Sequence, residues 1–261
     1  MIDIFLENDG ILIIVLAALS ILAGFIDAVV GGGGLITIPA LLIGLPKTAL
    51  PTIFGTNKIA ALAGTSVSAV KYARKIHFNY SLLFYVGLTA AISSFIGARA
   101  VQFINVNTLK PIILIILIVI AIYTFVKKDL GNAPTKELSD SLQIIYGSFI
   151  ALIVGFYDGF FGPGTGSFLV LGFVLILGFD FIQASAYSKI INCITNFSAL
   201  IVFIKNGNYI LHIAIILALA NMLGNYFGTH VALKKGNKFV RIIYLIVVSI
   251  MIVRYGYDVF N

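Results

Sequence analysis

An apolar run near the N-terminus contains the stretch Gly24-Phe25-Ile26-Asp27-Ala28-Val29-Val30-Gly31-Gly32-Gly33-Gly34. A carboxylate followed by four successive glycines is unusual inside such a run. The pattern returns in the second half of the chain as Gly155-Phe156-Tyr157-Asp158-Gly159-Phe160-Phe161-Gly162-Pro163-Gly164-Thr165-Gly166. Both copies read Gly-Phe-x-Asp, and a glycine-rich break follows after three more residues. The doubled motif predicts that two similar halves of the chain each carry the same structural device.

The composition predicts a polytopic membrane protein. Of the 261 residues, 60% are hydrophobic and only 10% are charged, and the mean hydropathy is +1.09. Soluble domains have about 25% charged residues, so a soluble chain of this composition would lack a polar surface. Runs such as 111–126 are apolar on every side, which favours helices over the alternating strands of a β-barrel.

Membrane-crossing segments are expected wherever about 20 apolar residues follow one another. We predict full crossings near 11–30, 53–70, 81–98, 109–126, 142–161, 182–204, 209–228 and 242–255. Two shorter apolar segments, 35–45 and 167–179, follow the glycine breaks. Pro39 and Pro46 are expected to reinforce the first break. Basic loops are predicted around 71–77 and 234–241.

One constant offset along the chain, without a gap, places Asp27 on Asp158 and Lys58 on Lys189. We therefore predict a first membrane repeat over 1–130, a polar linker over 131–141 and a second repeat over 142–261. Each repeat has about four full transmembrane helices and one short broken or re-entrant segment. If each short segment counts as a crossing, the second repeat is inverted, and the basic loops lie inside with both termini outside. If the short segments are re-entrant, the inversion stays open.

The glycine clusters are expected to open the backbone of the helices that contain them. Non-helical backbone is tolerated at membrane depth only inside protein or around a cavity. The N-terminus of a helix that follows such a break attracts anions. The alternative is that these glycines only allow helices to pack closely. Because two matched clusters occur, we favour broken helices that line an anion site.

Lys58 and Lys189 each lie a few residues into an apolar segment, where a lysine is costly. They could extend to the membrane surface, but we expect them to hold an anion in a cavity. Lys189, Asn192 and Asn196 share one helix face by their spacing. The predicted substrate-binding residues combine glycines, amides, hydroxyls and the two lysines: Gly31, Gly32, Gly33, Gly34, Asn57, Lys58, Gly162, Gly164, Thr165, Gly166, Ser188, Lys189, Asn192 and Asn196.

Asp27 and Asp158 are assigned as coupling or structural acids. They could pair with a lysine, cap a broken helix or carry a proton, because a desolvated carboxylate binds protons more readily. The sequence contains no phosphate-binding loop, no catalytic motif and no clustered metal ligands, so we expect neither an enzyme nor a cofactor or metal site. The net charge of +7 is explained by basic cytoplasmic loops and requires no nucleic acid.

Three motifs together resemble the TauE/SafE family of sulfite exporters: Gly24-Phe-Ile-Asp27 with Gly31–Gly34, then Gly55-Thr56-Asn57-Lys58, and the second Gly155-Phe-x-Asp with Gly162-Pro-Gly-Thr-Gly166. The resemblance covers nearly the whole chain. It implies a secondary transporter of the cell (inner) membrane for sulfite, a sulfonate or another sulfur-containing organic anion.

From the residues and the resemblance together we expect an alternating-access permease whose partners are a small anion and the lipid bilayer. The alternatives are a passive anion channel and the membrane subunit of a larger complex. Homo-oligomer formation stays open. Because Tyr187-Ser188-Lys189 stands where the first half has Thr56-Asn57-Lys58, the site is not strictly two-fold symmetric.

Overall fold

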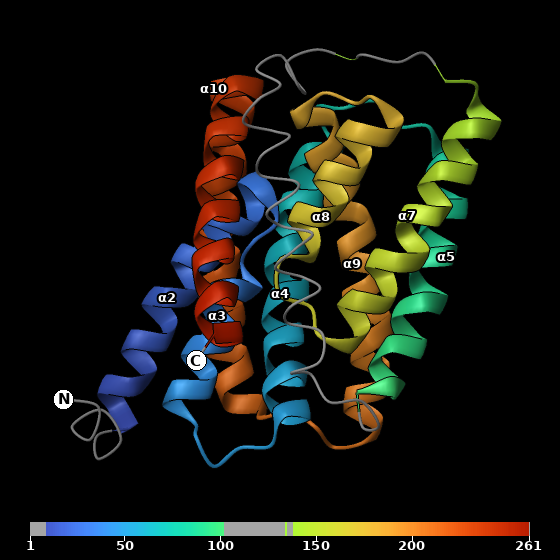
Figure 1. Cartoon of the computed structure of the whole chain (residues 1–261). Coiled ribbons are helices and arrows are strands. Elements are labelled where there is room, and N and C mark those ends of the chain that lie inside the picture. Colours follow the sequence, from blue (N-terminus) through green and yellow to red (C-terminus); the bar gives the residue numbers. More distant parts are fainter. Residues whose placement is uncertain (1–8, 102–133, 135–137, 261) are drawn as a thin grey trace.

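The computed structural model describes residues 9–101, 134 and 138–260. These residues form helices and no strands, which confirms the all-α prediction for the described part of the chain (Figure 1). The elements in chain order are α2 (Asp9–Val30), α3 (Gly34–Gly44), α4 (Leu50–Ala73), α5 (Tyr80–Ala100), α7 (Asp140–Phe160), α8 (Thr165–Gly172), the π-helix η2 (Phe173–Leu177), α9 (Phe181–Lys205) and α10 (Leu211–Phe260). The predicted crossing at 109–126 lies outside the described residues.

Five helices in the described part are long and apolar enough to cross a membrane, namely α2, α5, α7, α9 and α10. Their outward faces carry large apolar side chains that stay exposed, such as Ile14 (69%), Phe84 (65%) and Phe149 (59%). Such a surface suits hydrocarbon rather than water. The chain is therefore a multi-pass membrane protein, as its composition predicts.

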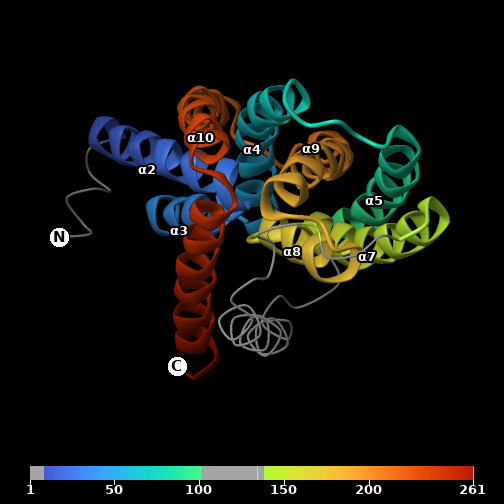
Figure 2. The same ribbon diagram turned by 90° about the horizontal axis from the view of Figure 1, so that it is seen from above.

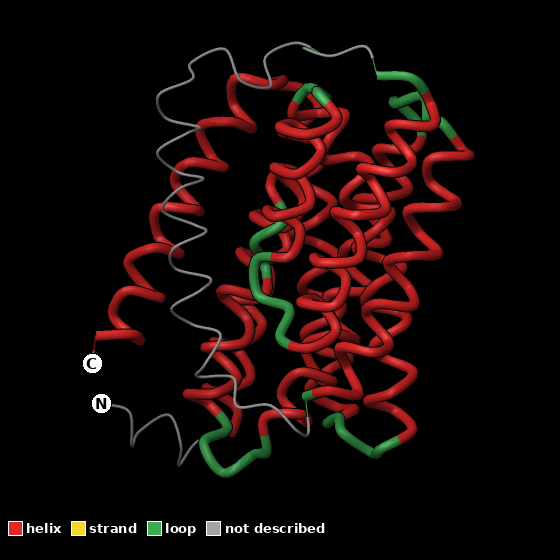
Figure 3. Tube along the Cα trace, turned by 45° about the vertical axis from the view of Figure 1, so that its right-hand side comes forward, coloured by secondary structure: helices red, strands yellow, loops and turns green. Residues whose placement is uncertain are grey.

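The glycine-rich breaks turn the chain back on itself near the centre of the bundle. The α2–α3 pair has both of its outer ends at the lower side in Figure 1, whereas the α7–α8 pair has both outer ends at the upper side. With a rise of about 1.5 Å per residue, the 11 residues of α3 extend about 16 Å, roughly half of a hydrocarbon core. The tube view follows both turns through the middle of the molecule (Figure 3).

The two breaks are in direct backbone contact. Gly31 has a φ of +83°, a conformation that side-chain-bearing residues rarely adopt. Its carbonyl accepts a hydrogen bond from the backbone N–H of Ser167 (3.1 Å), and the Ser167 hydroxyl donates to the carbonyl of Val30 (2.9 Å). The start of α8 therefore satisfies carbonyls that the end of α2 leaves open.

A buried polar network joins α2, α4 and α10, which lie side by side in the view from above (Figure 2). The amide of Asn221 donates to the Ser20 carbonyl (3.2 Å), and the Asn225 amide donates to the Asn221 side-chain oxygen (2.8 Å). Ser68 donates to the Asn225 side chain (2.6 Å). Hydrogen bonds of this kind, together with close packing, hold helices together in a membrane.

Two local predictions are corrected by the structure. The basic segment 234–241 is not a loop, because only Gly236 leaves the helical conformation, with φ 75° and ψ −172°. The chain reverses at this glycine and returns toward the lower end in Figure 1, so the basic residues belong to the flanking helical turns. Pro39 does not reinforce the first break but lies inside α3. Most of the predicted linker lies outside the described residues, and its end, Asp140–Ser141, already belongs to α7.

Candidate functional site

A small cavity lies where the two glycine breaks meet between α4 and α9. Its volume of about 30 Å³ holds one or two water molecules. The lining comes from both halves of the chain and mixes glycine backbone, polar side chains and apolar side chains: Asp27, Gly31, Gly34, Ile38, Phe54, Asn57, Lys58, Ala61, Asp158, Phe161, Gly162, Gly164, Thr165, Gly166, Asn192 and Asn196. Twelve of these sixteen were singled out from the sequence.

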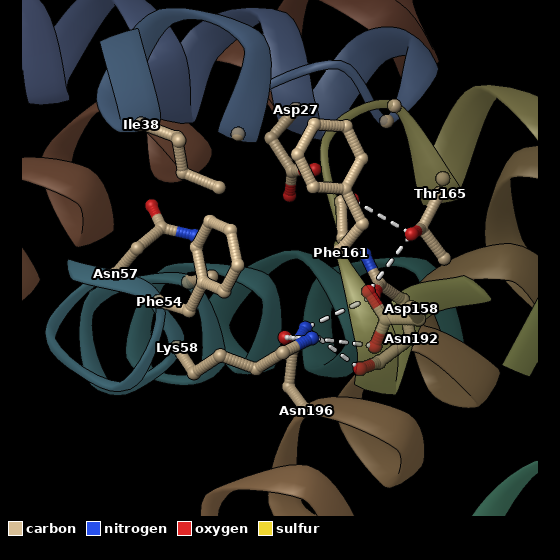
Figure 4. A pocket seen from close by; sticks show the side chains of 16 residues that line it. Asp27, Ile38, Phe54, Asn57, Lys58, Asp158, Phe161, Thr165, Asn192 and Asn196 are labelled. Carbon is tan, nitrogen blue, oxygen red and sulfur yellow. Dashed lines mark hydrogen bonds and ion pairs between the residues drawn. The ribbon is translucent and has the colours of Figure 1, made fainter. Parts of the chain in front are cut away.

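Lys58 enters this cavity from α4 and forms an ion pair across to α7. Its ammonium lies 2.8 Å from Oδ2 of Asp158 and donates to Oδ1 of Asn196 at 3.1 Å (Figure 4). The hydroxyl of Thr165, at the start of α8, donates to the other carboxylate oxygen of Asp158 (2.8 Å). Lys58 is only 3% exposed, so it does not extend to the membrane surface.

Lys189 occupies a different place, behind the cavity wall. It is fully buried, donates to the backbone carbonyl of Asp27 and lies 3.4 Å from Oδ2 of the same residue. Thr65 of α4 also donates to this carboxylate (3.0 Å). Lys189 therefore anchors the last turns of α2 just before the break, and it does not line the cavity as Lys58 does.

The amides on the cavity wall are held by neighbouring side chains. The side-chain oxygen of Asn57 accepts a hydrogen bond from Thr37 of α3. The amide of Asn196 donates to the side-chain oxygen of Asn192, one helical turn earlier (2.9 Å). The hydroxyl of Ser188 donates to the Gly166 carbonyl (3.1 Å) and supports the break rather than lining the cavity.

The glycines differ in what they do. Gly31, Gly34, Gly162, Gly164 and Gly166 line the cavity. Gly32 and Gly33 do not line it. A Cβ on Gly32 would lie 2.8 Å from the Val247 side chain, and one on Gly33 would lie 2.8 Å from the Ala23 carbonyl oxygen. These two glycines permit close packing, which was the alternative explanation for the cluster.

Four apolar residues, Ile38, Phe54, Ala61 and Phe161, complete the lining and were missed by reasoning from sequence. The rings of Phe54 and Phe161 both line the cavity and meet edge to face at 5.8 Å. A sequence signal existed for two of them, because Phe54 and Ala61 lie four residues before and three residues after Lys58 on one helix face. Phe161 carries no comparable signal, since its place depends on the break that follows it.

Backbone N–H groups at two helix starts are available at the cavity. Gly34 begins α3 and Gly166 is the second residue of α8, and both line the cavity. Among the hydrogen bonds of the described residues, none uses the N–H of either glycine. The described residues also contain no cluster of three or more His, Cys, Asp or Glu side chains that could hold a metal ion. The arrangement can thus offer one ammonium, amides and open backbone N–H groups to a small polar solute.

The sequence that forms this arrangement matches a known protein family. The family model described as "Sulfite exporter TauE/SafE" matches residues 16–255, which include both breaks and both lysines. The chain belongs to the TauE/SafE family. This is a family of membrane transporters, so the resemblance noted in the motifs is confirmed over most of the chain.

Curated relatives cover almost the whole TauE/SafE chain. A protein from Sinorhizobium sp described as "Probable membrane transporter protein ORF9" is 37% identical over 88% of this chain and 86% of its own length. "Probable membrane transporter protein YfcA" of Escherichia coli K12 is 37% identical over 94% of this chain and 89% of its own. A relative in Haemophilus influenzae with the description "Probable membrane transporter protein" is 32% identical over 95% of both chains. No solved structure matches the chain at significant similarity.

Proposed function

We propose that this TauE/SafE protein is a secondary transporter that moves a small anion across the cell (inner) membrane by alternating access. The proposed cargo is sulfite, a sulfonate or another sulfur-containing organic anion. The family description supports the sulfur class, because it names a sulfite exporter. The site residues support the anion class through the chemistry they place at the cavity.

One observation carries the proposal most directly: the buried ammonium of Lys58 lies in a cavity that two helix starts also line. Lys58 Nζ contacts Asp158 and Asn196, and the cavity includes Gly34 and Gly166, whose N–H groups make no hydrogen bond among the described residues. Backbone N–H groups at helix N-termini attract anions, and the broken helices of transporters use them in this way. A sulfonate or sulfite head group offers several acceptor oxygens to these donors.

We further propose that the chain is an inverted repeat, with halves 1–130 and 142–261 around the linker. Three observations support this. The first residues of α7, α8, α9 and α10 follow those of α2, α3, α4 and α5 by the same offset that relates Asp158 to Asp27. The two ion pairs are exchanged by this offset, since Lys58 pairs with Asp158 and Lys189 with Asp27. The two helical hairpins also enter the bundle from opposite ends (Figure 1).

In this proposal the two halves move against each other around the cavity. Both ion pairs join one half to the other, so they hold the halves together in the arrangement that the structure shows. The basic residues that follow α4 and those around Gly236 lie at the upper end in Figure 1. Basic residues collect on the cytoplasmic side, which supports termini outside the cell.

Thermal stability in the presence of candidate anions tests the proposed function. Purified protein is heated with sulfite, sulfate, thiosulfate, sulfoacetate, ethanesulfonate, taurine, chloride or carboxylates. A ligand that binds the folded state raises its stability by RT ln(1 + [L]/Kd), so a true substrate shifts the melting temperature selectively. Stabilisation by neutral or cationic solutes alone would contradict an anion site. Counterflow in proteoliposomes then separates a carrier from a passive channel, because a channel shows none.

Replacing Lys58 by methionine is expected to weaken binding of the stabilising anion about 10- to 150-fold. The substitution removes a charged hydrogen bond, and such bonds contribute about 1.5–3 kcal/mol. Lys75→Met is the matched control, because Lys75 is an exposed lysine in the loop after α4 and its loss changes the net charge equally. Isothermal titration of both variants measures the effect. Equal affinities in the two variants would remove Lys58 from the binding site.

A further inference from the structure

The charges at the cavity are balanced before any anion enters. Among the described residues that line the cavity or pair with its lining, the ionisable groups are Lys58, Asp158, Asp27 and Lys189. Two ammonium groups face two carboxylates, so the set is neutral. A monovalent anion that enters alone leaves one uncompensated negative charge in a buried site, which is unfavourable in a low-dielectric interior.

The excess charge falls on Asp158. An anion that binds the Lys58 ammonium competes with Oδ2 of Asp158, which lies 2.8 Å from it. Asp158 is 2% exposed, and its other oxygen accepts a hydrogen bond from the neutral hydroxyl of Thr165. A carboxylate that loses its cation in such surroundings is stabilised by binding a proton.

We propose that Asp158 takes up one proton when an anion binds Lys58, so that the protein carries the anion and the proton together. This inference rests on the proposed function. Oδ2 of Asp158 gains the proton from water on the side from which the anion enters. The Lys58–Asp158 ion pair breaks, an ion pair between Lys58 and the anion forms, and the total charge of the site is unchanged. Release of both on the other side restores the original pair.

The equivalent acid, Asp27, has a different role. Its cation, Lys189, does not line the cavity and also donates to the Asp27 backbone carbonyl, so an incoming anion does not reach that ammonium. Thr65 holds the same carboxylate. The Lys189–Asp27 ion pair therefore stays intact while Lys58 exchanges Asp158 for the anion. The two pairs are equivalent in the sequence repeat, but only one of them faces the solute.

The surroundings of Asp158 contain few other groups that could take the proton. Among the described residues, the charged or titratable groups around the cavity and the two ion pairs include Lys58 and Tyr72 of α4, Asp27 of α2, and Lys189 and Cys193 of α9. Cys193 lies 3.7 Å from the Ser66 hydroxyl, and the guanidinium of Arg99 lies over the ring of Phe95 at 4.4 Å. Thr165 of α8 and Asn196 of α9 are neutral.

Calorimetric titration in buffers of different protonation enthalpy counts the protons bound with each anion. The full chain in detergent is titrated with ethanesulfonate, which stays ionised, and with sulfite. Charge balance predicts that the wild type takes up about one proton more per bound anion than Asp158→Asn does. Sulfite's own protons cancel in this difference. The control variant Asp140→Asn is expected to keep the wild-type proton number, because this exposed carboxylate at the start of α7 neither lines the cavity nor pairs with either lysine.

A second measurement keeps the proposal testable if Asp158→Asn does not fold. With one linked proton, the wild-type Kd for ethanesulfonate, which stays ionised, rises about tenfold per pH unit over the range in which the free protein holds the Lys58–Asp158 ion pair. Two results would overturn the coupling and leave the anion site standing. One is that wild type and Asp158→Asn take up the same number of protons per bound anion, and the other is that the wild-type Kd for ethanesulfonate does not change with pH. If proton uptake on anion binding is lost in Asp27→Asn but kept in Asp158→Asn, the assignment of the proton to Asp158 is overturned. If neither probe binds, the proposed function fails and the coupling fails with it.

Discussion

Replacing Lys189 by methionine is expected to destabilise the folded protein by about 3–5 kcal/mol, the cost of removing one partner of a buried ion pair. Lys189 is fully buried, lies 3.4 Å from Oδ2 of Asp27 and donates to the carbonyl of the same residue. Methionine fills a similar volume but supplies neither the charge nor a donor. Asp27 then becomes a buried carboxylate held mainly by the Thr65 hydroxyl. Unfolding by denaturant in detergent micelles measures the loss.

A double variant separates this pair from the general cost of changing a core residue. Asp27→Asn combined with Lys189→Met removes both charges, so much of the stability lost in Lys189→Met alone is expected to return. Such non-additivity is the signature of two groups that interact directly. A double variant as unstable as the sum of the two single variants would show that the pair is not coupled. A Lys189→Met protein as stable as the wild type would disprove the anchoring role.

Replacing Gly31 by alanine is expected to cost about 2–5 kcal/mol, which combines strained backbone with a collision. The φ of +83° is unfavourable for any residue with a Cβ. The added methyl group would also lie 2.7 Å from the backbone nitrogen of Ser167, and backbone in a packed centre cannot move aside easily. The two breaks would separate, and with them the cavity lining from α2 and α8. Thermal unfolding and anion binding by the same preparation measure both effects.

Gly207 provides a matched control on the same chain. Its φ of +68° is also positive, but a Cβ at this position meets nothing within 4 Å. Alanine at this position therefore brings only the backbone cost of about 1–2 kcal/mol. The difference between Gly31→Ala and Gly207→Ala isolates the contact between the two breaks. Equal losses at the two positions would mean that this contact contributes nothing to stability.

Much of the helical layout could be predicted from the sequence. The start of α2, the short helices after each break and the helix that carries Lys58 agree with the apolar runs to within a few residues. The basic segment at 234–241 was misjudged because charge density suggests a loop, whereas one glycine with positive φ is sufficient to reverse the chain. Proline chemistry also predicts that Pro39 reinforces the break, but α3 continues through this residue.

The residues that line the cavity could be predicted in kind but not in arrangement. Repeat-equivalent positions suggested equal roles for Lys58 and Lys189, yet the structure places only Lys58 on the cavity. Spacing along one helix cannot distinguish a side chain that points to a cavity from one that points to the next helix. The aromatic contact between Phe54 and Phe161 joins residues from different halves, and no local pattern predicts such a contact.

By itself the sequence determined that this is a helical membrane protein of the TauE/SafE family with two glycine breaks and four buried charges. Composition, apolar run length and repeated motifs are local properties, and a bilayer translates them directly into helices because backbone groups must be paired within each segment. Only the tertiary structure decided which lysine meets which aspartate, which glycines face the cavity and which pack against neighbours. Those choices depend on contacts between residues far apart in the sequence, such as Lys58 with Asp158 and Lys189 with Asp27, which exist only once the helices have packed.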